Sequence, residues 1–423
     1  MTFTSPIPIV QPDDYNQPSH PGDLLSRQQR LIYVFVLGAL TALGPFTIDL
    51  YLPAFPALQV DLGVTETAIQ LTLTGTVIGF AAGQLIVGPW SDRVGRRLPL
   101  IVSCLLHVAA SVGAALSPDI TWLTVFRLLV GFGAAAGGVV TMALVRDLFG
   151  GKPLVKMLSR LSLVNGSAPI LAPLIGSQLL RITDWRGVFW VLSGYGLVVA
   201  IATVLMIVET LPKLDRQVAT SSLASRFRVL FHDRIFIGAV VVGALNFTGL
   251  FAYLSTSSFL FQDVYHFTPQ QYGLAFGMNS VGVVAGVQVS SWLMRTRAQP
   301  QWILAGTTVV QILAAVAIFV FDHTGAGYWG TAIPLWFLIC ACGFAFPAVQ
   351  VLALAHHGAE AGTASSILGA ANFGLAGIVG PILGTLGTTD ASPMAGVMFL
   401  CACLATLSVW LVIRPRTVPP LSE

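Results

Sequence analysis

Residues 187–208 read GVFWVLSGYGLVVAIATVLMIV, a stretch in which no side chain carries a charge. A helix needs about 20 apolar residues to cross the hydrocarbon core of a bilayer. A membrane β-strand would be about ten residues long and would alternate in polarity, whereas this stretch is longer and apolar on every face. It therefore predicts a helix that spans a membrane.

Eleven further apolar runs are similar to this one in length. The twelve runs lie at 31–58, 67–90, 98–116, 120–145, 155–180, 187–208, 235–260, 271–293, 301–321, 332–354, 363–387 and 394–413. Of all residues, 55% are hydrophobic and only 9% are charged, whereas a soluble protein has about 25% charged residues. We predict an all-α membrane protein with 12 transmembrane helices. The composition excludes a soluble enzyme, a nucleic-acid binder and a secreted disulfide scaffold.

A long polar segment separates the first six runs from the second six. We expect a disordered tail at 1–29, a six-helix bundle at 30–208, a linker at 209–234, a second six-helix bundle at 235–413 and a C-terminal tail at 414–423. The first tail holds five prolines and few bulky apolar residues, a composition typical of disorder. The sequences GFAAG (79–83) and GVVAG (282–286) occupy the same place in each half. Parallel repeats of this kind let secondary transporters form a cavity midway across the membrane.

Lys and Arg residues are distributed unequally between the two sides of the predicted helices. The side that carries both chain ends has 18 of them, and the other side has only Arg181 and Arg186. Loops that stay in the cytoplasm are enriched in Lys and Arg. We therefore expect both termini, the linker and both tails in the cytoplasm.

Two charged side chains lie well inside the runs, Asp49 in the first and Arg127 in the fourth. A charge inside a membrane helix costs about 2.5–3.5 kcal/mol on insertion scales and usually has a function. Counted from the run ends, both residues lie at a similar depth, which predicts a shared aqueous cavity or a direct or relayed pair. Burial favours the neutral form of a carboxyl group, and a nearby guanidinium favours the charged form, so Asp49 could load and release a proton. A fixed ion pair that only orients the first helix is an alternative, as is a hydrogen-bonding role for Arg127 between helices.

The fifth run carries small residues and prolines at regular spacing. They are Gly166, Pro169, Pro173 and Gly176. Small residues let helix backbones approach each other, and each proline removes a backbone hydrogen bond and favours a kink. We predict a hinge in this helix at the wall of the cavity. Ordinary tight packing is an alternative that is compatible with a hinge.

The loop after the second run is the most distinctive stretch of the chain. Residues 83–97 read GQLIVGPWSDRVGRR, which resembles the signature of the major facilitator superfamily between its second and third helices. Other stretches are similar to the bicyclomycin and chloramphenicol resistance (Bcr/CflA) branch of drug:proton antiporters: TIDLYLP (47–53), RD (146–147), ETLP (209–212), FAYLS (251–255) and AGTASS (361–366). The resemblance covers residues 31–413 and implies the major facilitator fold of two six-helix halves.

The resemblance also implies roles for particular residues. In this branch the aspartate of the first helix is regarded as the proton site, which corresponds to Asp49, and the arginine of the fourth helix corresponds to Arg127. The acidic residue of the family loop, here Asp92, is regarded as pairing with basic groups and helix ends of the neighbouring half when the transporter faces outward, and Arg146 is a candidate partner. The gating residues are then Gly88, Asp92, Arg93, Gly95, Arg96, Arg97 and Arg146. The fifth helix has Ala172-Pro173 where many members have Gly-Pro, which weakens the hinge assignment.

Polar and aromatic side chains inside the runs are candidates for a substrate cavity. They are Tyr33, Asn165, Asn246, Phe247, Phe251, Tyr253 and Asn279. The last six runs contain no acidic residue, so neutral or weakly charged amphiphilic molecules fit better than polycations. We expect no cofactor and no metal. No Gly-rich stretch carries the Lys-Ser or Lys-Thr of an ATP site, and His356-His357 is interpreted as a solvated pair.

These observations predict a transporter of the bacterial inner membrane, not an enzyme, that exports small phenicol-like or bicyclomycin-like drugs by alternating access in exchange for protons. Two alternatives stay open. One is an exporter of an endogenous metabolite such as a sugar or amino acid derivative, and the other is a membrane sensor that transports nothing. The expected partners are the drug, protons and the lipid bilayer, with no nucleic acid, and the two-half architecture favours a functional monomer.

Overall fold

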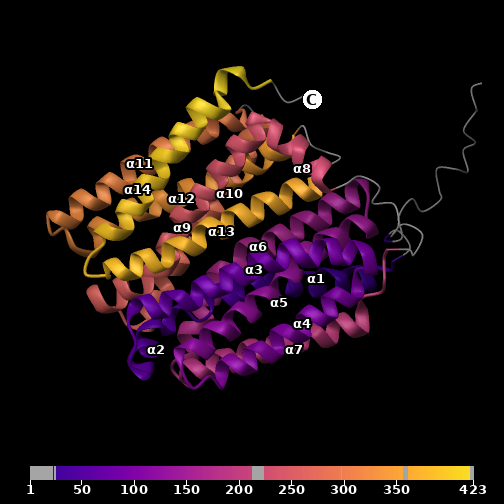
Figure 1. Cartoon of the computed structure of the whole chain (residues 1–423), viewed down its shortest axis with the longest axis horizontal. Coiled ribbons are helices and arrows are strands. Elements are labelled where there is room, and N and C mark those ends of the chain that lie inside the picture. The colour runs from indigo at the N-terminus through magenta and orange to yellow at the C-terminus, as the bar shows by residue number, and fades with distance from the viewer. Residues whose placement is uncertain (1–21, 23–24, 212–222, 297, 356–360, 420–423) are drawn as a thin grey trace, which may run out of the picture.

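The computed structural model describes residues 22, 25–211, 223–296, 298–355 and 361–419, which form helices joined by short turns (Figure 1). The helices of the twelve predicted runs are α1 Arg27–Asp49 with α2 Phe55–Leu62, α3 Glu66–Val94, α4 Arg97–Ala115, α5 Ile120–Leu148, α6 Gly151–Leu179, α7 Trp185–Met206, α9 Arg234–Phe259, α10 Pro269–Thr296, α11 Pro300–His323, α12 Gly327–Leu354, α13 Ala361–Leu386 and α14 Ser392–Leu407. Short π-helical turns, η5 Leu260–Val264 and η6 Ser408–Ile413, extend α9 and α14. The predicted all-α fold with two groups of six membrane helices is confirmed.

The segments outside these helices are described only in part. Most of the predicted tail 1–29, residues 212–222 of the linker and residues 420–423 lie outside the described residues. The described part of the linker contains α8, Leu223–His232. Helix α1 already begins at Arg27, because Ser26 and Gln29 form a reciprocal pair of hydrogen bonds of 2.9 and 3.2 Å that caps the helix.

Polar residues between the apolar runs determine where several helices begin. The side chains of Asp119, Asp184 and Asp233 accept backbone N–H groups at the first turns of α5, α7 and α9, over 2.8–3.0 Å. The first N–H groups of a helix have no partner within the helix, and an Asp at this position supplies one. Each of these caps lies next to an apolar run, so the sequence fixes the start of the membrane helix locally.

The first predicted run, 31–58, is not one continuous helix. Helix α1 ends at Asp49, a 3-10 turn covers Leu52–Ala54, and α2 begins at Phe55. Pro53 and Pro56 have no N–H, so they cannot donate to the carbonyl groups of Asp49 and Leu52. The hydrogen-bond ladder of α1 therefore stops at Asp49, and the carboxyl group of this residue lies at a helix break.

Among the described residues, eleven helices or helix pairs are long and apolar enough to cross a membrane. Helix α6 is the predicted span that is not among them, and its sequence includes Asn165, Ser167 and two prolines. It packs against α1 of its own half and α10 of the other half.

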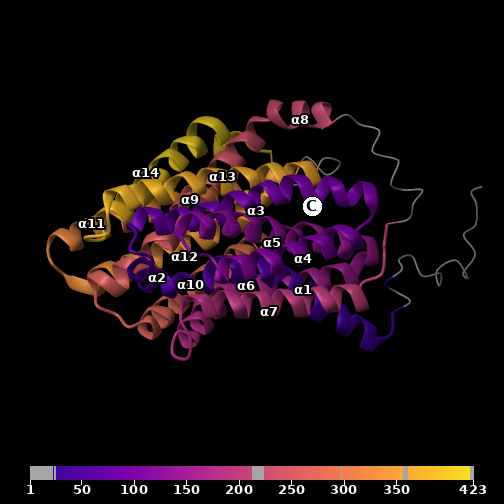
Figure 2. The same ribbon diagram turned by 60° about the horizontal axis from the view of Figure 1, so that its bottom comes forward.

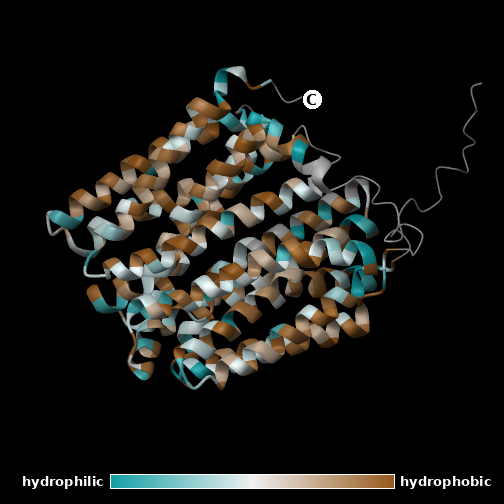
Figure 3. Cartoon of the chain, viewed as in Figure 1, coloured by the Kyte–Doolittle hydropathy of each residue, from teal (hydrophilic) through white to brown (hydrophobic). Residues whose placement is uncertain are grey.

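The two halves lie side by side, with α1–α7 in indigo to magenta and α9–α14 in salmon to yellow (Figure 1). Helix α3 of the first half lies along α13 of the second half in both views (Figures 1 and 2). The described chain starts and finishes at the same end of the bundle, which we call the terminal end; the opposite end, with α2, is the distal end. Hydrophilic residues gather at these two ends, and the helices between them are mostly hydrophobic (Figure 3).

The halves are joined differently at the two ends. At the distal end one core contains residues of both halves, and the rings of Phe55 and Phe259 lie 5.6 Å apart across the contact. Ser258 Oγ donates to Leu52 O over 2.6 Å, and Gln262 donates to Pro53 O over 3.1 Å. Towards the terminal end each half has a separate core. The halves are therefore closed against each other at the distal end and have separate cores at the terminal end.

Candidate functional site

The break in the first membrane helix places Asp49 at the interface between the halves. The residue is 5% exposed, and its Oδ1 atom has no hydrogen-bond partner among the described residues. Its neighbours Leu50 and Tyr51 belong to the core shared by both halves. Tyr253 and Tyr272 of the other half belong to the same core. A buried carboxyl group therefore lies where the two halves meet.

Arg127 is fully buried in α5 and contacts the same break, but it does not form the direct ion pair that was one of the predicted arrangements. Its Nη1 donates to Thr47 O over 2.9 Å, and its guanidinium carbon lies 3.8 Å from the ring centroid of Tyr51. The carbonyl groups of a last helical turn have no partner within the helix and carry negative partial charge. Arg127 thus caps the C-terminal end of α1 beside Asp49.

His107 holds Thr47 from the other side. Its Nε2 lies 2.9 Å from Thr47 Oγ1, while its Nδ1 has no partner among the described residues. Two nitrogens of Arg127, Nε and Nη2, also lack partners there. The last turn of α1 is therefore fixed by a histidine and an arginine, and this buried polar group retains unused hydrogen-bonding capacity.

Helix α6 continues without interruption through both predicted hinge prolines, Pro169 and Pro173. Pro173 has no N–H to donate to the carbonyl group of Pro169. Ser280 Oγ of α10 lies 3.3 Å from this carbonyl oxygen and shares its one proton between it and Phe276 O of its own helix, at 3.0 Å. Near the end of α6, Ser177 O accepts Gln270 Nε2 over 2.8 Å. The prolines therefore supply a hydrogen bond between the halves. Sequence reasoning found the prolines but missed Ser280 and Gln270.

The two predicted glycines of α6 lie at close contacts on either side of this helix. A Cβ on Gly176 would collide with the carbonyl group of Leu50, directly after Asp49, and a Cβ on Gly166 would lie 3.4 Å from Val284 of α10. Helix α6 is thus wedged between the break of α1 and the opposite half, and small residues permit both approaches.

Some predicted cavity residues do lie at the interface. Phe247 contacts the ring of Phe373 at 4.8 Å, and Phe373 contacts Phe80 of the other half at 4.9 Å. Phe251 is buried in the shared core near Gly380. Tyr253 accepts a hydrogen bond of 3.0 Å from Asn279. Phe247, Phe251 and Tyr253 therefore lie on the side of the second half that packs against the first half.

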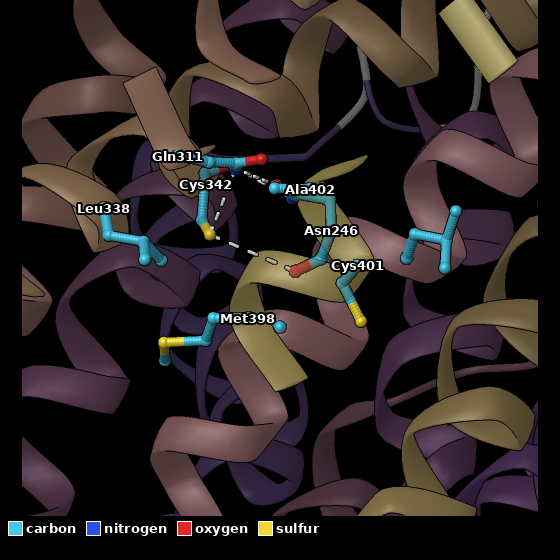
Figure 4. Close-up of a pocket in the computed structure, with 9 residues that line it drawn as sticks. Asn246, Gln311, Leu338, Cys342, Met398, Cys401 and Ala402 are labelled. Carbon is cyan, nitrogen blue, oxygen red and sulfur yellow. Dashed lines mark hydrogen bonds between the residues drawn. The ribbon is translucent and has the colours of Figure 1, made fainter. Parts of the chain in front are cut away.

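Other predicted cavity residues lie elsewhere. Tyr33 belongs to the separate core of the first half at the terminal end. Asn246 lies inside the second half, where its Nδ2 donates to Cys342 O over 3.2 Å and its Oδ1 accepts Gln311 Nε2 over 2.7 Å (Figure 4). The side chain of Asn165 lies outside the described residues, as do His356 and His357. Tyr33 and Asn246 are therefore packing residues in this structure.

The predicted gating residues form a charge cluster at the terminal end of the first half. Asp92 pairs with Arg96, and Arg96 Nε donates to Asp147 Oδ2 over 3.0 Å. Arg146, the candidate partner of Asp92 in an outward-facing transporter, is exposed and forms no ion pair with Asp92 in this structure; Asp147, the residue beside it, takes part in the cluster. One helical step separates neighbouring residues by about 100°, so Arg146 and Asp147 face different directions.

Glu209, from the ETLP stretch, connects this cluster to α4. Its carboxylate accepts the backbone N–H groups of Arg96 and Arg97 over 2.8 and 3.3 Å, which caps the first turn of α4. Arg97 also donates to Val204 O over 2.6 Å. Asp92, Arg96, Arg97 and Asp147 all belong to the first half, and Glu209 is the first residue of the linker.

The remaining gating residues have local roles in this structure. Gly95 ends α3 with a φ of 106°, a conformation that favours glycine. A Cβ on Gly88 would lie 3.2 Å from Val139 of α5, and Arg93 is exposed in the last turn of α3, where a cation is favourable. Within the described part of the chain, no hydrogen bond or ion pair joins Asp92, Arg96 or Arg97 to the second half.

The fold and its buried charged groups define a polytopic helical membrane protein with two six-helix halves. The sequence profile of the Major Facilitator Superfamily matches residues 35–381, so the chain belongs to that family. Its members are transporters, and this chain is a transporter, not an enzyme.

Related sequences confirm the resemblance to the bicyclomycin resistance branch. An uncharacterized MFS-type transporter of Bacillus subtilis, YdgK, is 34% identical over 92% of this chain and 97% of its own length. A bicyclomycin resistance protein homolog of Haemophilus influenzae is 29% identical over 90% of this chain and 97% of its own. The multidrug resistance protein MdtL of Klebsiella pneumoniae is 26% identical over 91% and 96%.

Solved structures confirm the fold. A partially occluded inward open conformation of the xylose transporter XylE from E. coli has a TM-score of 0.70 at 15% identity, covering 92% of this chain and 98% of its own. A D-xylose-proton symporter has a TM-score of 0.71 at 16% identity, covering 93% and 99%.

Proposed function

We propose that this chain exports small amphiphilic drugs, such as phenicols or bicyclomycin, from the bacterial cytoplasm in exchange for protons. Asp49 binds the proton, and Arg127 couples its state to the helix break. The observation that carries the proposal is a buried carboxyl group at the interface of the halves that has no ionic partner among the described residues. The multidrug and bicyclomycin names of relatives over nearly the full chain support the drug substrate.

The excess of Lys and Arg supports placing the terminal end in the cytoplasm of the bacterial inner membrane. With this orientation the distally closed structure faces inward. Drug would then enter from the cytoplasmic side between the separate cores, and would leave after the halves part at the distal end and close at the terminal end. The cluster of Asp92, Arg96 and Asp147 would meet the second half in that outward-facing state.

Burying a carboxylate costs far more than burying a neutral carboxylic acid. In the closed interface Asp49 therefore favours the bound proton, and it releases the proton when water or drug enters from the cytoplasmic side. Because Arg127 holds the carbonyl group two residues earlier, movement of α1 against α5 would change the charge near Asp49. One proton that crosses 100 mV supplies about 2.3 kcal/mol, enough for roughly a fifty-fold drug gradient at about 1.4 kcal/mol per tenfold.

The experiment uses proteoliposomes loaded with a pH-sensitive dye. Chloramphenicol or bicyclomycin is added to the natural chain, to Asp49→Asn and to Asp61→Asn. Asp61 is a matched control because it lies just beyond the same helix break but pairs with Arg186 over 2.8 Å at the distal surface. We expect a drug-dependent proton movement that Asp49→Asn abolishes and Asp61→Asn retains.

Two outcomes would overturn the proposal. Uphill drug transport retained by Asp49→Asn would remove Asp49 from the coupling. No proton movement with either drug, together with export of an endogenous metabolite from cells that overproduce the chain, would favour a metabolite exporter.

A further inference from the structure

Helix α3 carries a line of buried polar groups that the proposed proton site does not use. Glu66, Gln70 and Thr74 are spaced four residues apart, so they lie on one face with a rise of about 6 Å between neighbours. Each has a buried polar atom without a partner among the described residues: Glu66 Oε2, both amide atoms of Gln70, and Thr74 Oγ1. Gln70 is 0% exposed and Thr74 is 6% exposed. We call these three residues the polar file.

The polar file faces glycines of the other half. A Cβ placed on Gly384 of α13 would lie 3.1 Å from Gln70 Oε1 and 2.6 Å from Thr67 Cα, and one on Gly380 would lie 3.1 Å from Thr74 Oγ1. The amide and hydroxyl groups are therefore enclosed by the closed contact between α3 and α13, which run side by side (Figure 1).

The file leads from the distal end to the depth of Asp49. Glu66 is the first residue of α3 at that end. Tyr51 of the broken first helix bonds Thr72 over 3.1 Å, and a Cβ on Gly44 would lie 3.0 Å from Phe80. Because α1 and α3 run antiparallel, these two contacts bring Asp49 level with Thr74.

We propose that Glu66, Gln70 and Thr74 form a hydration path through which water, and with it a proton, reaches the level of Asp49 from the distal side. This inference rests on the proposed function for the fate of the proton. A proton from distal water would bind at the mouth by Glu66, pass along waters held by Gln70 and Thr74, and end on the Asp49 carboxylate, which becomes neutral.

The glycine face explains why water enters before drug. A buried amide without a partner costs about 1–3 kcal/mol, and a water molecule that makes two to four hydrogen bonds satisfies such groups. Since glycines of α13 lie next to Gln70 and Thr74, a separation of about one water diameter at these positions would let water reach both groups. A drug needs a much wider opening. Protonation of Asp49 would therefore occur early in distal opening.

The first test compares Gln70→Leu with Gln84→Leu. Gln84 is a matched control, because it lies on the same helix and also faces a glycine of α13, with its Oε1 atom 2.5 Å from a Cβ position on Gly369, but near the terminal end. Two rates are measured for each variant in proteoliposomes. The first is drug counterflow without a proton gradient, and the second is drug transport driven by acid on the distal side. We expect Gln70→Leu to lower the acid-driven rate about tenfold, the effect of about 1.4 kcal/mol, with counterflow unchanged. Gln84→Leu should retain both rates. An acid-driven rate of Gln70→Leu equal to that of the natural chain would overturn the proposal.

A second measurement does not depend on proton transport. Gln70→Cys and Gln84→Cys are treated with a small membrane-impermeant methanethiosulfonate reagent, and modification is quantified by mass spectrometry of the peptide containing the new cysteine. We expect residue 70 to react when the reagent is on the distal side and residue 84 when it is on the terminal side. A residue 70 that never reacts from the distal side would overturn the hydration path. Reaction at residue 70 without any drug-driven proton movement in the natural chain would retain the path and contradict the proposed function.

Discussion

Each half of the molecule buries a polar cluster, and the two clusters are satisfied to different degrees. In the first half Thr47, His107 and Arg127 fix the end of α1, while His107 Nδ1 and two nitrogens of Arg127 have no partner among the described residues. In the second half Gln311 and Asn246 bond each other over 2.7 Å, and neither has a buried polar atom without a partner.

The difference in hydrogen bonding suits two different roles: the cluster of the second half is part of a rigid scaffold, and the cluster beside Asp49 is part of a site that rearranges. A satisfied buried network rigidifies its surroundings, whereas a group left without a partner destabilises the state in which it is buried. In the second half Asn246 and Gln311 are already hydrogen-bonded in the distally closed state. A change of conformation would not give them better partners. The cluster beside Asp49 retains hydrogen-bonding capacity that only a rearranged interface or a ligand can use.

The strongest test of this comparison is Asp49→Asn. Asparagine keeps the size of the side chain but cannot exchange a proton, so acid-driven drug transport should fall to that of protein-free vesicles. Drug counterflow and the amount of protein in the membrane should persist. Loss of folded protein in this variant would instead make Asp49 a structural residue like those of the second cluster.

A smaller effect is expected for Arg127→Lys. Lysine keeps the positive charge but not the flat guanidinium that stacks on Tyr51 and reaches Thr47 O. A hydrogen bond to a charged group contributes about 1.5–3 kcal/mol, so the turnover rate should fall by roughly tenfold or more. The rate is measured at saturating drug, with His232→Gln, whose side chain bonds only its own helix in the described chain, as the control. An unchanged rate would show that the cap on α1 is passive.

Asp92→Asn extends the comparison to the terminal end. The variant weakens the pair with Arg96, whose other partner Asp147 remains. Partly exposed ion pairs contribute about 0–1 kcal/mol, so turnover should fall at most about fivefold, with drug affinity unchanged. Stopped-flow transport and equilibrium drug binding separate the two quantities, and a change in affinity at constant turnover would contradict the gating role.

The smallest effect on transport is expected for Asn246→Leu. This change removes the hydrogen bond of 2.7 Å from Gln311 and the one of 3.2 Å to Cys342 O, and leaves Gln311 Nε2 with Cys342 Sγ at 3.3 Å, which should lower the free energy of unfolding by about 1–3 kcal/mol. Transport per folded molecule should not change. Thermal unfolding in detergent measures the loss of stability, and Asn246→Leu combined with Gln311→Leu should recover part of it because both partners become apolar. A transport defect at normal stability would place Asn246 in the moving site after all.

Much of the fold could be predicted because membrane helices are encoded locally. A long uncharged run with a polar cap defines its own helix, and the unequal Lys and Arg count predicts its direction. The break at Asp49 could also be inferred, since Pro53 and Pro56 remove the donors for the next turn. Asp49 and Arg127 were identified as candidates because charge inside lipid is expensive.

The sequence alone determined the twelve helices, their division into two halves, the family signature and the two buried charges, because each of these depends on a short stretch of chain and its solvent. Only the tertiary structure decided which groups meet. Arg127 donates a hydrogen bond to Thr47 O and does not pair with Asp49, and Asp92 forms its ion pair with Arg96 and not with Arg146. Asn246 is buried inside its own half. Gln70 and Thr74 of the polar file lie next to glycines of α13. These outcomes depend on helix rotation and on packing between residues far apart in the chain, which no local pattern specifies.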